Sequence, residues 1–238
     1  MMEEEDFRNY CVIKTFGVRT SDMQPYLQTG GVSVEFTEDC LDGTVRVVNT
    51  EGDREQFNAV VAEITAAFKD KVYAEGETSL AERLVEECRN RGITLAVAES
   101  LTVGMICSAI VDVPGASAVL SEGFVTYTNA AKVRRLHVRL STIESEGAVS
   151  AKTAGEMAKG LIEDRTADVA ISTTGCAGPD SDENDTPVGL AFVGVTTRTG
   201  GKVYRLNLSG ERNYIRKCVA NTAMFYALKC VENKDKEI

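Results

Sequence analysis

The sequence predicts an α/β protein in which a small α+β module precedes an α/β sandwich built on a mixed sheet. Helix and strand patterns alternate from Ser79 onward, which is typical of α/β folds. Two glycines, Gly200 and Gly201, link the last two expected strands as in an antiparallel hairpin, so the sheet is not wholly parallel. The N-terminal part has instead the order strand, short helix, two strands and longer helix. We therefore assign residues 1–76 to the module and residues 77–238 to the sandwich.

The N-terminal module shows the apolar patterns of three strands and one long helix. Alternation of apolar and polar side chains indicates half-buried strands, and an apolar face at helical spacing indicates an amphipathic helix. The segment KVYAEG, 71–76, follows this helix and is interpreted as a linker. In chain order we expect a strand at 9–18, a short helix capped by Ser21, strands at 32–36 and 44–48, and a helix at 53–71.

The sandwich is expected to begin with the helix whose ends are clearest. Ser79 and Glu82 form a capping box before an apolar stripe, and Gly92 follows the last turn. The later elements show the periods of buried strands and amphipathic helices. We expect strands at 93–98, 119–127, 168–173, 188–197 and 202–208, and helices at 101–112, 129–137, 150–164 and 211–232.

Composition and charge exclude several classes of protein. The 238 residues are 43% hydrophobic and 26% charged, which excludes a wholly disordered, collagen-like or membrane-embedded chain. The formal net charge is -10, and no run of basic residues is present, so a nucleic acid is not an expected partner. The acidic excess lies mostly in residues 1–75, where no two glycines are three apart. The module therefore also lacks a GxxG loop for binding RNA, and we expect a structural or dimerising role for it.

The cysteines and the N-terminus indicate a protein of a reducing compartment. The seven cysteines are scattered without a CxxC pair, so we expect neither a disulfide framework nor a metal site. The acidic start MMEEED does not resemble a secretory leader, and no apolar stretch reaches the ~20 residues of a membrane span. We expect a cytoplasmic protein without a membrane partner. Its single histidine, His137, is expected to be solvated or partly packed rather than catalytic.

Two polar loops that follow expected strands carry candidate catalytic residues, because ligands of open α/β sheets bind at the carboxyl ends of strands. In AESLTVG, 98–104, Ser100 is either a nucleophile or the N-cap of the next helix. In TYTNAAK, 126–132, Lys132 lies in the first turn of a helix, where the helix dipole disfavours its charge. A neutral lysine can accept the proton of a serine hydroxyl, and Tyr127 can relay it. A surface lysine and a core-edge tyrosine are the alternative.

Two further segments suit the binding of a charged substrate. The glycine-rich turn TTGCAGP, 173–179, can bring backbone amides close to an anion or an amide oxygen. The segment SGERNYIRK, 209–217, opens the last helix with Arg212 in its first turn. An arginine there can bind a phosphate through two N–H groups, and a solvated arginine is the alternative.

Together these loops resemble one protein family. AESLTVG, YTNAAK, GAVS, TGCAGP, PVG and GERNYIR, in this order, resemble the C-terminal domain of CinA-type competence/damage-inducible proteins, the nicotinamide-nucleotide amidases. The resemblance covers about 79–232, and KTFGV with KVYAEG resembles the small middle domain of full-length CinA. The family's large N-terminal domain is related to molybdopterin-binding proteins and associated with ADP-ribose pyrophosphatase activity. This sequence begins after that domain, so we expect the pyrophosphatase activity to be absent unless another polypeptide supplies it.

The resemblance implies a three-layer α/β/α sandwich and a specific reaction. That reaction is hydrolysis of the carboxamide of nicotinamide mononucleotide to nicotinate mononucleotide and ammonia, without a metal or an organic cofactor. Ser100 is the implied nucleophile, with Tyr127 and Lys132 as proton-transfer partners, and a homo-oligomer is implied. The residues implied to bind the nucleotide are Glu99, Thr102, Gly104, Asn129, Thr174, Gly175, Ala177, Gly178 and Arg212.

Two departures from the family pattern concern the substrate pocket. The family usually reads AESCTGG, whereas Leu101 and Val103 stand here, and a valine is expected to narrow the pocket or block a close backbone approach. An acidic segment, DSDENDTP at 180–187, replaces a glycine-rich loop. The alternative to the amidase is therefore a non-catalytic, partner-binding protein that keeps the scaffold.

Overall fold

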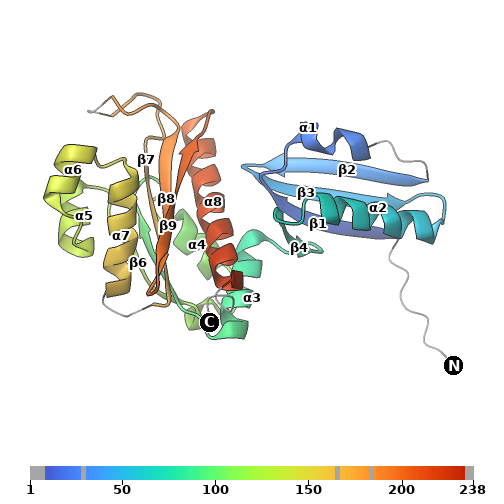
Figure 1. The fold of residues 1–238 in the computed structure, drawn as a ribbon, viewed down its shortest axis with the longest axis horizontal. Helices are drawn as coiled ribbons and strands as arrows, with labels where there is room; N and C mark the ends of the chain where they lie inside the picture. The colour runs from blue at the N-terminus through green and yellow to red at the C-terminus, as the bar shows by residue number, and fades with distance from the viewer. Residues whose placement is uncertain (1–8, 28–30, 164–166, 183–184, 234–238) are drawn as a thin grey trace. The chain divides into compact units, whose positions relative to one another are not determined.

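The computed structural model describes residues 9–27, 31–163, 167–182 and 185–233. The chain divides into two compact units, Met1–Leu80 and Ala81–Ile238. The first unit thus extends past residue 76, where the sequence suggested a boundary. Figure 1 labels the helices and strands of both units.

The first unit is an antiparallel sheet in the order β2-β3-β1-β4, with helix α2 packed on it. The expected order β-α-β-β-α is present, but the supposed linker at 71–76 forms a further strand, β4, paired with β1. This strand is short, so its apolar period was not distinguishable in the sequence. Tyr73 anchors it, because its ring is buried and its hydroxyl donates a 2.7 Å hydrogen bond to Asp42. The elements are β1 (Tyr10–Phe16), α1 (Thr20–Met23), η1 (Gln24–Tyr26), β2 (Val32–Asp39), β3 (Asp42–Asn49), α2 (Arg54–Ala67) and β4 (Val72–Glu75).

Helix α2 covers the core of the first unit. Asp53 caps it by accepting a hydrogen bond from the backbone N–H of Gln56. Its buried side chains Val60 and Ile64 belong to the same apolar cluster as the strand valines, including Val45 of β3. Burial of this apolar surface, at about 25 cal/mol per Å², is the main force that holds the helix on the sheet.

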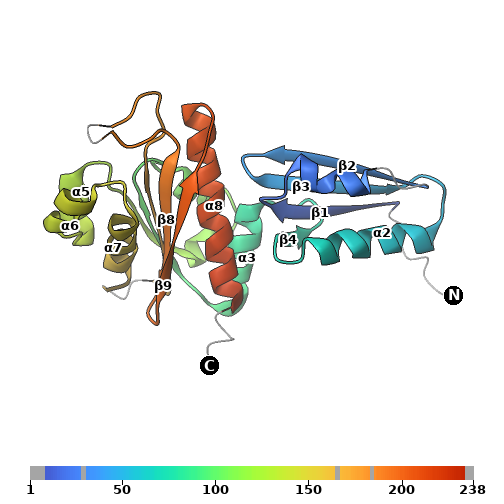
Figure 2. The ribbon, with the colours of Figure 1, turned by 45° about the horizontal axis from the view of Figure 1, so that its top comes forward.

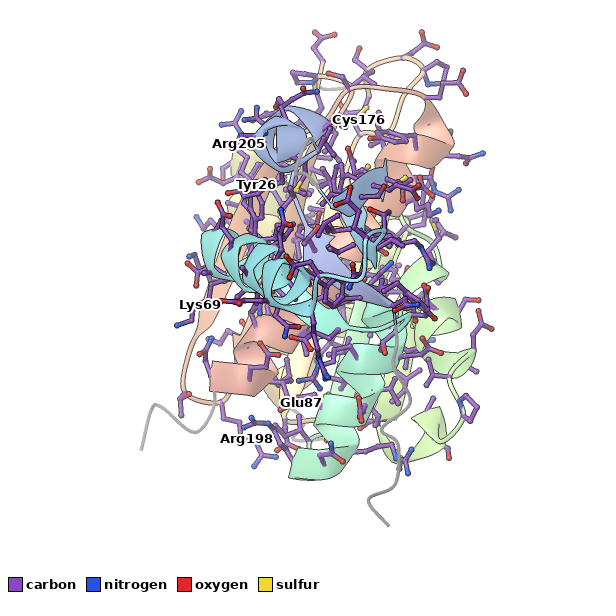
Figure 3. The ribbon with its side chains drawn as sticks, turned by 90° about the vertical axis from the view of Figure 1, so that its right-hand side faces the viewer. Tyr26, Lys69, Glu87, Cys176, Arg198 and Arg205 are labelled. Atoms are coloured by element: carbon purple, nitrogen blue, oxygen red, sulfur yellow. The ribbon has the colours of Figure 1, made fainter. Side chains whose placement is uncertain are left out.

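The second unit contains the expected mixed sheet, whose strand order is β6-β5-β7-β8-β9. Strand β5 pairs in parallel with β6 and β7, and β8 pairs antiparallel with β7 and β9. The last two strands form the expected hairpin, although its loop is residues 198–200 rather than the two glycines alone. Arg198 lies at the exposed tip of this hairpin (Figure 3). The strands are β5 (Leu95–Glu99), β6 (Leu120–Val125), β7 (Val169–Gly175), β8 (Leu190–Thr197) and β9 (Gly201–Asn207).

Helices cover both faces of this sheet, which confirms the three-layer α/β/α sandwich. Helices α5, α6 and α7 lie on one face and α4 and α8 on the other, as Figures 1 and 2 show. Helix α7 packs on β7 and β8 with a buried stripe that includes Met157 and Leu161. The helices are α3 (Leu80–Arg91), α4 (Met105–Val111), η2 (Ala116–Ala118), α5 (Asn129–Leu136), α6 (Leu140–Glu146), α7 (Ala151–Glu163) and α8 (Arg212–Asn233).

Two helices of the sandwich differ from the expectation. The helix expected at 101–112 begins only at Met105, because Val103 and Gly104 have φ angles of 46° and 88°, outside the right-handed helical region. The short helix α6 was not expected, since its seven residues, LSTIESE, hold too few apolar positions to show a helical period. His137 ends α5 with a φ of 55° and is exposed, as expected.

None of the seven cysteines, all of which lie within the described ranges, forms a disulfide, and Cys40, Cys88, Cys176 and Cys218 are buried. Within the described ranges, no helix is both long and apolar enough to cross a membrane.

Candidate active site

Ser100 lies directly after β5, at the carboxyl end of the sheet. Its backbone N–H donates a 3.0 Å hydrogen bond to the carbonyl of Thr173, so the chain is held beside β7 as it leaves the strand. The Ser100 side chain is largely buried. Residues 101–104 form a turn, and the N-cap of α4 is Gly104. The N-cap alternative for Ser100 is therefore wrong, and its hydroxyl is free for another role.

Lys132 reaches Ser100 from helix α5. Thr128 caps this helix, because its hydroxyl accepts a 3.1 Å hydrogen bond from the N–H of Ala131. The cap places Lys132 on the inner face, where it is only 2% exposed, so the surface-lysine alternative is wrong. Its Nζ lies 3.1 Å from Ser100 Oγ and donates to the carbonyl oxygens of Thr126, at 3.0 Å, and Tyr127, at 3.4 Å.

Burial makes the amine of Lys132 easier to deprotonate. It lowers the pKa of Lys132 from 10.5 to about 8, because a charged ammonium loses its hydration in the protein interior. The sequence analysis expected this direction but attributed it to the helix dipole, whereas the structure assigns it to desolvation. A general base works best with a pKa near the operating pH. The neutral amine has a lone pair that can accept the proton of Ser100 Oγ.

Tyr127 is arranged differently from the other two candidate catalytic residues. Its side chain is 58% exposed, so it is not a core-edge tyrosine. It contacts Lys132 through its backbone carbonyl rather than its hydroxyl. The ring nevertheless lines the cavity in front of Ser100.

A cavity of about 410 Å³ opens in front of the Ser100–Lys132 pair, within the size range of small-molecule sites. It brings together most of the residues proposed from the sequence: Ser100, Tyr127, Asn129, Lys132, Thr174, Gly175, Ala177, Gly178 and Arg212. Six further residues line the cavity: Leu101, Ala148, Val149, Cys176, Asp180 and Asp182. Of these, only Ala148 and Val149 lie outside the segments that the sequence already associated with the substrate pocket. The motif GAVS at 147–150 was the available signal for Ala148 and Val149. Cys176 is labelled in Figure 3.

Three of the proposed substrate-binding residues support the turn instead of lining the cavity. Glu99 is fully buried, and its carboxylate accepts hydrogen bonds from the backbone N–H groups of Ile106, at 3.3 Å, and Cys107, at 3.0 Å. It therefore satisfies the free amides at the start of α4, a position that favours negative charge. Thr102 Oγ1 lies 2.8 Å from Thr173 Oγ1. Gly104 is the left-handed N-cap already described.

Val103 does not narrow the cavity. Its side chain is 43% exposed and is not among the cavity-lining residues. The expectation that this valine would restrict the pocket is therefore wrong. Its effect is on the backbone, since a β-branched residue rarely adopts a positive φ.

The glycine-rich turn after β7 also lines the cavity. A Cβ on Gly175 would lie 2.6 Å from Cβ of Ala191, so only glycine allows this approach to β8. Arg212, the first residue of α8, donates from Nη1 to the carbonyl of Gly178. Arg212 is exposed, and its guanidinium both holds the turn and lines the cavity.

Charges of both signs line the cavity. Lys132 and Arg212 contribute positive groups, and Asp180 and Asp182 contribute carboxylates from the acidic segment. Asp182 accepts a 3.0 Å hydrogen bond from the N–H of Thr186, so its segment is folded back on itself. Residues 183–184 of the acidic segment lie outside the described residues.

The sequence analysis missed Arg216. Its Nε donates to the carbonyl of Leu101 at 2.8 Å, and its Nη2 donates to the carbonyl of Thr102 at 3.0 Å. The available signal was its spacing of four from Arg212, which places both side chains on one face of α8.

The chain matches known proteins over this unit and beyond it. The family described as CinA C-terminal domain matches residues 77–231. A CinA-like protein of Fusobacterium nucleatum is 31% identical over 243 aligned residues, which cover 98% of this chain and 59% of that protein. A CinA-like protein of Kosmotoga olearia is 38% identical over 191 residues, covering 79% of this chain and 45% of that one. The chain thus spans about half the length of the curated relatives it matches.

Solved structures show the same fold. The competence/damage inducible protein CihA from Agrobacterium tumefaciens is 35% identical with a TM-score of 0.61, covering 64% of this chain and 93% of that chain. A competence-damaged protein (CinA) superfamily protein from Klebsiella pneumoniae is 28% identical with a TM-score of 0.62, covering 65% of this chain and 96% of that chain. By its family match, its relatives and its fold, the chain belongs to the CinA family.

Proposed function

We propose that this protein is a serine amidase that hydrolyses the carboxamide of nicotinamide mononucleotide to nicotinate mononucleotide and ammonia. The observation that carries the proposal is the 3.1 Å contact between Ser100 Oγ and the buried amine of Lys132, whose pKa is lowered to about 8. A serine hydroxyl is a weak nucleophile unless a base takes its proton. A lysine with a pKa near 8 can do so without a histidine.

The proposed reaction has two stages, in which an ester forms on Ser100 and is then hydrolysed. Ser100 Oγ attacks the carboxamide carbon while its proton passes to Lys132 Nζ. Collapse of the tetrahedral intermediate breaks the C–N bond, and Lys132 returns the proton to the leaving amine, so ammonia departs and an ester remains on Ser100. Lys132 then takes a proton from water, whose oxygen attacks the ester, and the proton returns to Ser100 Oγ as the nicotinate is released. Backbone amides of the glycine-rich turn, whose residues line the cavity, are proposed to bind the oxyanion.

The shape and charge of the cavity support a nucleotide substrate. Its volume of about 410 Å³ suits a mononucleotide. Arg212, which also lines the cavity, is the positive group that is proposed to meet the phosphate through charge-assisted hydrogen bonds. Asn129 and Thr174 supply neutral donors and acceptors for the carboxamide and ribose.

The test is ammonia release from nicotinamide mononucleotide by the purified full chain, with nicotinate mononucleotide identified by chromatography. Ser100→Ala should abolish the reaction. Ser108→Ala is the matched control, because Ser108 is exposed on α4 and does not line the cavity. No turnover by the wild-type protein would overturn the proposal and favour the non-catalytic, partner-binding alternative. Turnover by the Ser100 variant would show that another nucleophile acts.

A further inference from the structure

Val103 occupies a backbone conformation that its own side chain opposes. Its φ of 46° lies in the left-handed region, where the Cβ of an L-residue approaches the following carbonyl oxygen. The branch at Cβ increases the crowding. The side chain itself is 43% exposed, so burial does not fully compensate the conformation. Other contacts must therefore hold this turn, and they must act on the backbone around Val103.

Arg216 makes such contacts directly. Its guanidinium donates to the two successive carbonyl oxygens that precede Val103, those of Leu101 and Thr102, from Nε and Nη2. Nη1 of the same group donates to Asn213 Oδ1 at 3.1 Å, which orients the guanidinium plane. Two parallel donors in one rigid plane fix the orientation of two peptide groups at once.

The helix that carries Arg216 is a firm base for this contact. Helix α8 packs on β7, β8 and α4. Figure 1 shows it beside the sheet. Ile215 and Cys218, which flank Arg216 on the helix, are fully buried. The contact spans 115 positions in the sequence, from Leu101 to Arg216. The turn is thus tied to a distant, well-packed element.

The turn at residues 101–104 helps to fix the position of Ser100. The backbone N–H of Ser100 is held by Thr173, and Glu99 fixes the start of α4 beyond the turn. Between these two points, Arg216 holds the carbonyls of Leu101 and Thr102. Thr102 is also held by the N–H of Met105, which donates to its carbonyl at 3.3 Å, and by Thr173 Oγ1, 2.8 Å from its hydroxyl. Relaxation of Val103 toward negative φ would rotate the adjoining peptides and move Ser100 Oγ away from Lys132.

We infer that Arg216 is a positioning residue that holds the left-handed turn at Val103 and thereby keeps Ser100 in line with Lys132. The inference rests on the proposed amidase activity. It differs from the role of Arg212, because Arg216 is not among the residues that line the cavity. Arg216 should consequently affect the chemical step and leave substrate binding almost unchanged.

A double-mutant cycle tests the inference. Arg216→Gln should lower kcat for nicotinamide mononucleotide by about 100-fold, the loss expected when a reacting atom is displaced by about 1 Å, while KM changes little. Val103→Gly alone should leave kcat near the wild-type value. In the double variant, kcat should be about tenfold higher than in Arg216→Gln alone. Glycine adopts a positive φ without crowding, so the turn no longer needs the arginine. The effects of the two substitutions on the melting temperature should also be non-additive.

Arg205→Gln is the matched control, because Arg205 is exposed on β9 (Figure 3) and does not line the cavity. It should leave kcat, KM and the melting temperature unchanged. Additive effects in kcat and in melting temperature, or a wild-type kcat for Arg216→Gln, would overturn the inference while the amidase proposal stands. A wild-type protein without amidase activity would overturn the proposed function and the positioning role with it. A non-additive melting cycle would then show only that Arg216 holds the turn.

Discussion

The buried ammonium of Lys132 predicts a pH-dependent stability that the variant Lys132→Met lacks. Burial lowers the pKa of Lys132 from 10.5 to about 8 in the folded chain, whereas the unfolded chain keeps the ordinary value. Below pH 8 both states bind the proton, and folding carries the full cost of burying the charge. Between pH 8 and pH 10.5 the unfolded state binds more protons than the folded state, so the free energy of unfolding rises with pH.

The size of this rise follows from the same two pKa values. One pKa unit corresponds to about 1.4 kcal/mol, so the interval from about 8 to 10.5 corresponds to about 3 kcal/mol. Lys132 is only 2% exposed, and solvent therefore screens the effect little. Methionine has a similar length and no charge, so the variant does not titrate at this position. The unfolding free energy of the wild type, minus that of the variant, should rise by about 3 kcal/mol across this window.

Urea unfolding followed by circular dichroism, from pH 7 to 10.5, measures this difference. Other titrating groups occur in both proteins and cancel in the subtraction. Lys159→Met is the control, because the side chain of Lys159 is 70% exposed on α7. A constant difference for Lys132→Met would refute the buried-charge argument.

In the activity assay, kcat of the wild type should rise with pH and level off above about 8, and Lys132→Met should lower kcat far more than it raises KM.

The remaining predictions concern the cavity. Ser100→Ala should abolish amidase activity and leave the circular dichroism spectrum unchanged, because the serine is not a helix cap; more than a trace of residual rate would remove it from the mechanism. Arg212→Ala should weaken nicotinamide mononucleotide by about 1.5–3 kcal/mol and the phosphate-free riboside hardly at all, and equal losses for the two ligands would show that the arginine only holds the turn. Replacing Asp180 and Asp182 by Asn should lower KM for the phosphorylated substrate at low salt and flatten the salt dependence of KM, with kcat nearly unchanged. The reason is that like charges repel within a Debye length, about 10 Å at 0.1 M salt. An unchanged KM at every ionic strength would contradict this repulsion.

Several features of the fold were predictable because they are encoded locally. The alternation of helices and strands after Ser79 follows from apolar periods within short windows, and the hairpin follows from the turn residues around Gly200. The candidate loops lie at strand ends, and in a sheet with parallel strands such ends meet at one edge. In the structure, Ser100, Lys132 and the turn at 174–178 do lie around one cavity. Strand β4 escaped the same reasoning because four residues do not establish a period.

What only the tertiary structure decided depends on groups that are distant in the sequence. The lowered pKa of Lys132 comes from burial by surrounding elements, so no local pattern contains it. The hydrogen bond from the N–H of Ile106 to the Glu99 carboxylate can be recognised only once α4 is known to begin at Met105. The helix begins there because of a left-handed turn at Val103, which local propensity opposes and which Arg216 supports from the last helix. Local propensity therefore specified the order of the elements, whereas long-range hydrogen bonds and desolvation determined the conformation and protonation of the site.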